Sequence, residues 1–127
     1  MDPLIIEESI KTPTISFDSS SGVLEIRGKS IPENSLEFYK PVFDWLDQYS
    51  AKPASQTEFR VQLEYFNTSS SKCLLDLFRK LEAAAVSGTS KVKVSWFYEA
   101  DDEDMMEAGD DYQALVKIPF ELIKLEE

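Results

Sequence analysis

The hydrophobic pattern changes from period two to helical spacing between residues 66 and 68, and this change constrains the fold most. The alternating residues are Phe59, Val61, Leu63 and Tyr65, and those at helical spacing are Leu74, Leu75, Leu77, Phe78 and Leu81. Alternation is typical of a half-buried strand, and spacing of three and four residues is typical of an amphipathic helix. The pattern therefore predicts a strand over 59–66 that leads directly into a helix over 68–86, which ends at Ser87-Gly88.

The rest of the chain repeats this order of elements. A hairpin is predicted from 15–17 and 23–27, with residues 1–14 as an edge strand or arm. Ser30-Ile31-Pro32-Glu33 resembles a capping box, so we expect a helix from there to Tyr49, kinked or split at Pro41. A loop over 50–57 precedes the strand at 59–66. After the helix over 68–86, a strand over 92–98, a helix over 101–115 and a strand over 118–125 are predicted.

The expected order β-β-α-β-α-β-α-β predicts an α/β fold. Helices that alternate with strands after an opening hairpin indicate a mixed, largely parallel sheet packed against about three helices. With 127 residues and no linker-like segment, we expect a single domain over 1–127.

The charge and the histidine content exclude several classes of function. The net charge is −11, from 13 basic and 24 acidic residues, which opposes binding to nucleic acids or anionic membranes. Histidine is absent, which removes the commonest general base and the commonest zinc ligand. Cys73 is the single cysteine, and no apolar run is long enough to span a membrane. We expect a cytoplasmic protein that binds other proteins and needs no cofactor or metal.

Four consecutive hydroxyl residues stand at the junction between the strand and the second helix, in the stretch Asn67-Thr68-Ser69-Ser70-Ser71-Lys72. Helix N-termini carry unpaired N–H groups and a positive partial charge, so they tolerate a phosphate. Capping alone explains one hydroxyl, because Ser, Thr and Asn are preferred N-cap residues. Four hydroxyls exceed that need, so the sequence predicts phosphorylation in this block.

A second block, Glu99-Ala100-Asp101-Asp102-Glu103-Asp104, follows the strand over 92–98. Acidic residues in a first turn complement the helix dipole, and an acidic surface suits a basic partner. The alternative is a Mg²⁺ site, which would make the protein a magnesium-dependent phosphohydrolase. The spacing does not match a calcium EF-hand loop.

Other candidate sites are weaker. Cys73 and Arg79 have the Cys-x5-Arg spacing of phosphatases, but the residues between them form an amphipathic helix segment rather than a phosphate-binding loop. Asn67 to Lys72 lacks the glycines of a nucleotide P-loop. Trp45 and Trp96 are expected in the core, with a partner surface as the alternative.

Several segments together resemble the SiaC family of bacterial regulatory phosphoproteins. They are Ser30-Ile31-Pro32-Glu33-Asn34, Phe38-Tyr39-x-Pro41, Trp45-Leu46-x-x-Tyr49, Leu63-Glu64-Tyr65-Phe66-Asn67-Thr68-Ser69-Ser70-Ser71-Lys72, Trp96-Phe97-Tyr98-Glu99, Asp101-Asp102-Glu103-Asp104-Met105 and Glu107-Ala108-Gly109. The similarity extends from about Leu24 to Phe120, nearly the whole chain.

This resemblance implies a non-catalytic switch with a STAS-like fold, akin to anti-anti-sigma proteins. In the family, a threonine of the hydroxyl block is phosphorylated by a serine/threonine kinase of the anti-sigma type, and a PP2C-type phosphatase reverses the reaction. Thr68 is the matching residue. The unphosphorylated form binds and activates a diguanylate cyclase, which raises cyclic di-GMP and favours biofilm formation. The residues expected to contact partners are Asn67, Ser69, Ser70, Ser71, Lys72, Asp101, Asp102, Glu103 and Asp104.

Overall fold

Six strands form one sheet in the order β1-β2-β3-β4-β5-β6. The structure is a computed structural model that describes residues 1–125. The strands are β1 (Leu4–Ile6), β2 (Thr14–Asp18), β3 (Val23–Ser30), β4 (Gln56–Phe66), β5 (Lys91–Glu99) and β6 (Phe120–Leu125). The first two pairs of neighbours are antiparallel and the last three are parallel. The predicted mixed, largely parallel sheet is confirmed; residues 126–127 of the predicted domain lie outside the described residues.

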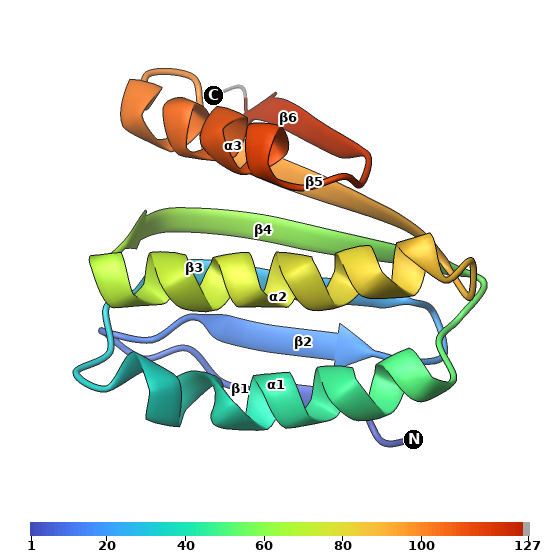
Figure 1. Cartoon of the computed structure of the whole chain (residues 1–127). Coiled ribbons are helices and arrows are strands. Elements are labelled where there is room, and N and C mark those ends of the chain that lie inside the picture. The colour runs from blue at the N-terminus through green and yellow to red at the C-terminus, as the bar shows by residue number, and fades with distance from the viewer. Residues whose placement is uncertain (126–127) are drawn as a thin grey trace.

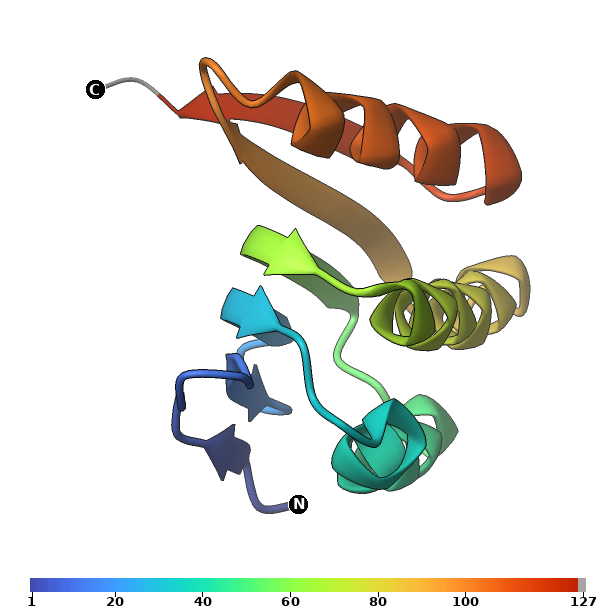
Figure 2. The same cartoon turned by 90° about the vertical axis from the view of Figure 1, so that its left-hand side faces the viewer.

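Three helices, α1 (Ser35–Ala51), α2 (Thr68–Val86) and α3 (Glu103–Leu115), connect the parallel strands. Such crossovers are nearly always right-handed, so helices that join strands in sequential order fall on the same face of a sheet. Figures 1 and 2 show α1 and α2 side by side on one face, with α3 over β5 and β6. All three helices start at the edge where the parallel strands end (Figure 1). In the described part of the chain, no helix is both long and apolar enough to span a bilayer.

The core lies between the sheet and the helices and contains most of the large apolar side chains. Its largest fully buried members are Trp96, Tyr39, Tyr49, Phe17, Phe59, Phe78, Ile15, Leu24, Ile26, Leu46, Leu74 and Leu77. Trp45 is also buried, against Phe17 and Tyr49. The prediction that both tryptophans belong to the core is therefore confirmed.

The start of α1 differs from the prediction. Asn34, not Ser30, caps the helix: its side chain accepts a hydrogen bond of 3.1 Å from the backbone N–H of Glu37 and donates one of 3.4 Å to the Glu37 carboxylate. Ser30 instead ends β3 and is fully buried. The four-residue spacing that suggested a capping box at Ser30 occurs again from Asn34 to Glu37, and the second instance forms the cap.

Pro41 lies inside α1 but does not split it, so this prediction was wrong in part. Proline removes the hydrogen bond to the carbonyl four residues earlier, here that of Glu37. Both Glu37 and Pro41 are on the exposed side of the helix, where water can satisfy that carbonyl. The helix consequently continues to Ala51, and the predicted loop shortens to residues 52–55.

The other boundaries agree with the predictions to within three residues. The hairpin of β2 and β3 forms as expected, and the arm at the N-terminus provides the edge strand β1. Helix α2 has the predicted bounds, Thr68–Val86. Helix α3 begins at Glu103 rather than at residue 101, because Asp102 serves as its N-cap.

A β-bulge interrupts β4 near its end. Gly28 of β3 pairs with Leu63, but the next residue, Lys29, pairs with Tyr65, so Glu64 is the extra residue. The bulge turns Tyr65 away from the core, and 58% of its surface is exposed. Phe66 packs inside instead, 6.1 Å from Trp96 between ring centroids. The alternating pattern that placed Tyr65 with the inward-facing residues was wrong at this position, because a bulge shifts the side-chain alternation by one residue.

Candidate partner-binding site

Asn67 is the single residue between β4 and α2, and it holds the start of the helix. Its side-chain oxygen accepts a hydrogen bond of 2.9 Å from the backbone N–H of Ser70. Its own backbone N–H donates to the carbonyl of Ser30 at 3.0 Å, and its side-chain amide donates to that of Pro32 at 3.3 Å. The cap of α2 is thus provided by Asn67, and no hydroxyl of the block is needed for it.

The hydroxyl residues next to Asn67 have different surroundings. Ser69 is exposed, and its Oγ bonds to Ser35 Oγ at 2.7 Å and donates to Asn67 Oδ1 at 3.2 Å. Ser71 is half-buried and donates to the backbone carbonyl of Thr68 at 2.8 Å. Thr68 is exposed, and within residues 1–125 its hydroxyl has no hydrogen-bond partner. Thr68 is therefore the hydroxyl of the block that is both accessible and free.

Ser70 is fully buried and belongs to a network that ties β3, α1 and α2 together. Its Oγ accepts a hydrogen bond of 2.8 Å from Ser30 Oγ and donates one of 3.0 Å to the Ser30 carbonyl. Ser30 Oγ is also 2.6 Å from Tyr39 OH, and burial raises the pKa of Tyr39 to about 12. Ser70 consequently has a structural role in this conformation, and the prediction that it contacts a partner does not fit its burial.

The acidic block lies at the start of α3. Asp102 is half-buried and caps the helix by accepting a hydrogen bond of 3.0 Å from Met105 N–H. Asp101, Glu103 and Asp104 are exposed, the last two within the first turn of the helix. Residues 99–111 contain eight carboxylates and no Lys or Arg. This end of α3 presents concentrated negative charge to the solvent.

Both predicted blocks lie at one edge of the sheet, where α2 and α3 begin (Figure 1). Tyr112 of α3 donates a hydrogen bond of 2.8 Å to the backbone carbonyl of Ser71 in α2 and so bridges the two helices. A groove of about 350 Å³ lies between the end of β4 and the start of α3, and we call it the Tyr65 groove. It is lined by Glu64, Tyr65, Phe66, Asp102, Asp104, Met105 and Ala108.

Glu64 and Tyr65 also belong to this edge, although the sequence did not indicate them as partner-binding residues. Both side chains are exposed and line the groove together with Asp102 and Asp104. Their positions follow from the bulge in β4, which the alternating pattern conceals. Lys72, another residue expected to contact partners, is exposed on α2.

Two features bear on the enzymatic alternatives, the acidic block and Cys73. Among residues 1–125, no group of three or more Asp, Glu, Cys or His side chains is arranged to hold a metal ion. Cys73 is buried in α2, and burial together with the Asp76 carboxylate raises the pKa of its thiol. A phosphatase nucleophile needs the opposite shift, towards the thiolate.

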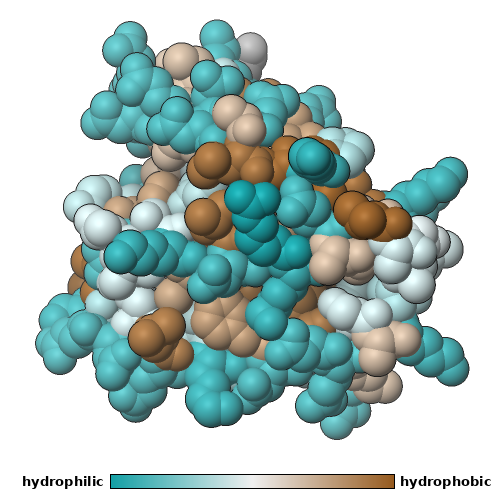
Figure 3. All heavy atoms as spheres, viewed as in Figure 1, coloured by the Kyte–Doolittle hydropathy of each residue, from teal (hydrophilic) through white to brown (hydrophobic). Residues whose placement is uncertain are grey.

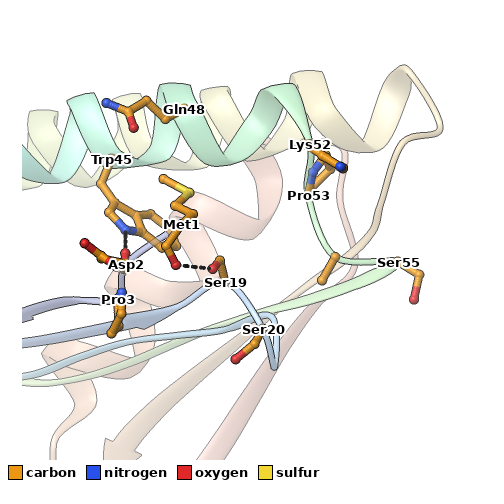
Figure 4. Close-up of a pocket in the computed structure, with 11 residues that line it drawn as sticks. Met1, Asp2, Pro3, Ser19, Ser20, Trp45, Gln48, Lys52, Pro53 and Ser55 are labelled. Carbon is orange, nitrogen blue, oxygen red and sulfur yellow. Dashed lines mark hydrogen bonds between the residues drawn. The ribbon is translucent and has the colours of Figure 1, made fainter.

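Figure 4 shows a cleft of about 960 Å³ near the N-terminus, away from both blocks. Trp45 lies in its wall and donates a hydrogen bond of 2.9 Å from its indole N–H to the carbonyl of Asp2. Ser19 donates similarly to the carbonyl of Met1 at 3.1 Å. These bonds hold residues 1–3 against the hairpin turn and α1. The charged side chains that line this cleft, Asp2 and Lys52, form no ion pair with each other among the described residues.

The helix-covered side of the molecule is mainly hydrophilic, and its hydrophobic side chains form small separate patches (Figure 3). A partner that binds at the edge described above therefore meets polar groups, carboxylates and a few exposed apolar side chains rather than one large apolar surface. Contacts of that kind depend on charge and shape more than on apolar area.

Solved structures from Pseudomonas aeruginosa are similar to this chain over nearly its whole length. One is apo-SiaC, with a TM-score of 0.88 and 32% sequence identity, covering 97% of this chain and 99% of that one. Another is a complex of the diguanylate cyclase SiaD with its activator SiaC, with a TM-score of 0.90 and 32% identity, covering 96% and 99% of the two chains.

Sequence comparison points to the same group of proteins. An uncharacterized protein of Pseudomonas aeruginosa strain UCBPP-PA14 is 33% identical over 120 residues, which is 94% of each chain. The family model for SiaC family regulatory phosphoproteins matches residues 6–125. By sequence and by fold, this chain belongs to the SiaC family of regulatory phosphoproteins.

Proposed function

We propose that this chain is a phosphorylation-gated activator of a diguanylate cyclase. In this proposal the unphosphorylated form binds the cyclase, a serine/threonine kinase of the anti-sigma type phosphorylates Thr68, and a PP2C-type phosphatase restores the active form. The resulting change in cyclic di-GMP controls biofilm formation. The observation that carries the proposal is the exposed hydroxyl of Thr68, the first residue of α2. This hydroxyl forms no hydrogen bond within residues 1–125.

The surroundings of Thr68 suit a phosphate without loss of the fold. The first turn of α2 contains no acidic residue, so the positive end of its dipole is not neutralised by the chain itself. A phosphate adds a charge of about −1.5 to −2 and three acceptor oxygens near that end. Lys72 stands four residues further along α2, on the same helix face, and is exposed. Both features favour an additional negative charge at Thr68.

The gate acts on the partner, through the contact surface beside Thr68. Ser69 bonds to Ser35, which brings the start of α1 next to the start of α2. Leu36 follows Ser35 and is 70% exposed, so it offers an apolar contact at this position. A partner packed over Leu36 and Thr68 would remove the phosphate from water, which costs several kcal/mol unless a cation in the interface pairs with it. Because about 1.4 kcal/mol corresponds to a tenfold change in affinity, such a loss is enough for a switch.

The choice of partners rests on the relatives. The complex of SiaD with SiaC pairs a diguanylate cyclase with a protein of the same fold and 32% identity. The kinase and the phosphatase are part of the proposal because a regulatory phosphoprotein needs enzymes that add and remove its phosphate. We infer no catalytic activity for the chain itself and a cytoplasmic location. The free, buried thiol of Cys73 is in keeping with a reducing compartment.

The test measures cyclic di-GMP formation by a purified diguanylate cyclase from the same genome, as a function of the concentration of this chain. We expect activation by the unmodified chain and by Thr68→Ala, and none by the chain phosphorylated on Thr68. Ser69→Ala is the matched control, since it removes a neighbouring exposed hydroxyl and leaves Thr68 intact.

Mapping of the modified residue completes the test. The protein purified from its native host is analysed by intact mass and by phosphopeptide sequencing. Modification found only on Ser69, Ser70 or Ser71 would contradict the assignment to Thr68. A phosphorylated chain that activates the cyclase as well as the unmodified chain would contradict the gate.

A further inference from the structure

We infer that the Tyr65 groove binds an arginine side chain of the partner, with the Tyr65 ring as a stacking surface and the carboxylates of the groove as its ion-pair partners. The inference rests on the proposed function, because the partner in question is the cyclase. The groove is a second contact, separate from Thr68, and the partner must supply an arginine side chain to it.

The first observation is the bulge that exposes Tyr65. A continuous alternation would point this ring into the core, where the other apolar residues of β4 lie. The extra residue Glu64 turns it outwards instead, to 58% exposure, and Phe66 fills the inner position. Bulges are found preferentially where a side chain is re-aimed at a site, and they are rare between parallel strands such as β3 and β4. Exposed tyrosines are also among the residues most enriched at interface centres.

The second observation is the charge of the groove. Glu64 reaches it from β4, while Asp102 and Asp104 reach it from the start of α3. Within residues 1–125 none of these three carboxylates forms an ion pair. One oxygen of Asp102 is occupied as the helix cap. Residues 99–111 contain no Lys or Arg that could neutralise the remaining carboxylate oxygens. The groove therefore carries negative charge that no cation of the described residues neutralises.

An arginine fits these features better than other cations. Its guanidinium is planar, stacks on an aromatic face and pairs with carboxylates through two parallel hydrogen bonds. Its aliphatic stem can lie against apolar walls, here those of Met105 and Ala108. A lysine ammonium would pair with the carboxylates but would gain less from the ring. A divalent metal would need three or more converging ligands, which these side chains do not form among the described residues.

The groove and the gate have separate roles in this scheme. The groove supplies attraction that depends on charge and on the Tyr65 ring, and it is present in both forms of the protein. The contact around Leu36 and Thr68 is the part that a phosphate disrupts. A change in the groove should accordingly weaken binding of the unmodified chain without restoring binding to the phosphorylated one.

The main experiment measures binding isotherms of four variants with the diguanylate cyclase used above, across a salt series. We expect Tyr65→Ala to weaken binding about tenfold or more, and Tyr65→Phe to stay within about threefold because it keeps the ring. The double variant Glu64→Gln with Asp104→Asn should weaken binding about tenfold and flatten the dependence on salt. The matched control, Asp110→Asn with Asp111→Asn, removes the same charge from exposed positions of α3 outside the groove; it should change affinity less than twofold.

A second measurement does not depend on the cyclase. The isotopically labelled chain is titrated with the peptide acetyl-Gly-Arg-Leu-Arg-Gly-amide and with its lysine counterpart, followed by NMR. We expect amide shifts at 64–66 and 102–108, larger with arginine than with lysine and absent in Tyr65→Ala.

The two measurements separate the possible failures. If the unmodified chain binds the cyclase but Tyr65→Ala binds equally well, the groove inference is wrong and the proposed function stands. If the unmodified chain does not bind the cyclase, the proposed function fails, and the peptide titration alone decides the groove. Peptide shifts spread evenly over all acidic residues, or equal for arginine and lysine, would overturn the inference. Thermal melts establish that each variant is folded, which the exposure of Tyr65 favours.

Discussion

The starts of α2 and α3 are built alike and charged differently. Each helix follows a parallel strand and is capped by a side-chain oxygen that accepts from the N–H three residues later, from Asn67 to Ser70 at 2.9 Å and from Asp102 to Met105 at 3.0 Å. The first turn of α3 contains Glu103 and Asp104, and its cap is itself a carboxylate. The first turn of α2 has a neutral cap, four hydroxyl residues and no acid.

The start of α3 carries a permanent negative charge, whereas the start of α2 carries one only when a phosphate is added. At α3 the chain neutralises the helix dipole with its own carboxylates, and a constant negative surface remains for a basic partner. At α2 the dipole is left unneutralised, so a charge can be added there and removed again without loss of the helix. The two helix starts lie at one edge of the sheet, which allows one partner to contact both (Figure 1).

The helices also differ in what fixes them to the rest of the molecule. Helix α2 is held through buried hydroxyls, with Ser70 bonded to Ser30 of β3. Helix α3 lies close to the sheet because Gly109 faces Trp96, whose indole N–H donates a hydrogen bond of 2.9 Å to the carbonyl of Met105. The predictions below test the charge difference and the two modes of attachment.

The largest effect is expected from phosphorylation of Thr68. The modified chain should lose affinity for the cyclase by about 100-fold or more, which corresponds to about 2.7 kcal/mol. Its melting temperature should change little, because the start of α2 tolerates negative charge. Isothermal titration calorimetry and thermal melts of both forms measure the two quantities. A phosphorylated chain that is largely unfolded would show that α2 does not accept the charge, contrary to the comparison.

The next effect is expected from Gly109→Ala in α3. A Cβ at this position would lie 2.5 Å from Trp96 Cδ1 and 2.7 Å from Leu122 Cδ2, so the helix must move away from β5 and β6. We expect destabilisation near the upper end of the range for overpacking, about 3 kcal/mol, measured by chemical denaturation. Ala114→Gly, at an exposed position of the same helix, is the control and should cost about 1 kcal/mol through helix propensity alone. A stabilised Gly109→Ala variant would show that the close approach is not required.

Within the hydroxyl block, Ser70→Ala should destabilise the protein and Ser69→Ala should not. Removal of the buried Ser70 hydroxyl leaves Ser30 Oγ without one of its partners, at a cost of about 1–2 kcal/mol. Ser69 is exposed, and its partners can bond to water, so its loss should cost less than about 0.5 kcal/mol. Urea denaturation of the two variants measures both values. Equal costs would mean that the block is not divided into a structural and an accessible part.

The smallest effect is expected from exchanging the charge at the first residue of each helix. Thr68→Asp should stabilise α2 by about 0.3–1 kcal/mol at low ionic strength, and Glu103→Gln should destabilise α3 by a similar or smaller amount. Both changes should shrink as salt is added. Thr68→Asp should also weaken cyclase binding, though less than the phosphate does, because a carboxylate has less charge and a different shape. If Thr68→Asp destabilised the protein, the dipole of α2 would already be neutralised by another group.

Local patterns were sufficient to predict most of the elements. The bounds of α2 follow from its amphipathic spacing and its Ser87-Gly88 end, and the strands follow from alternation, with errors of at most three residues at their ends. The hydroxyl and acidic blocks could be recognised as runs of one residue type at predicted strand-to-helix junctions. Parallel topology implies that such junctions lie at the same edge of the sheet. The capping residue of α1 was missed because two spacings of the same kind occur within eight residues, and only packing against β3 selects one of them.

The class of fold, the two blocks and the family can be read from the amino-acid sequence alone. The reason is that hydrophobic period, capping chemistry and motifs are local properties of the chain. The tertiary structure alone decided which hydroxyl is accessible, since Ser70 and Thr68 are alike in chemistry and differ only in what packs over them. It also decided the direction of Tyr65, because a bulge depends on the register between β3 and β4, residues far apart in the chain. Burial and register are properties of pairs of segments, and a single segment does not encode them.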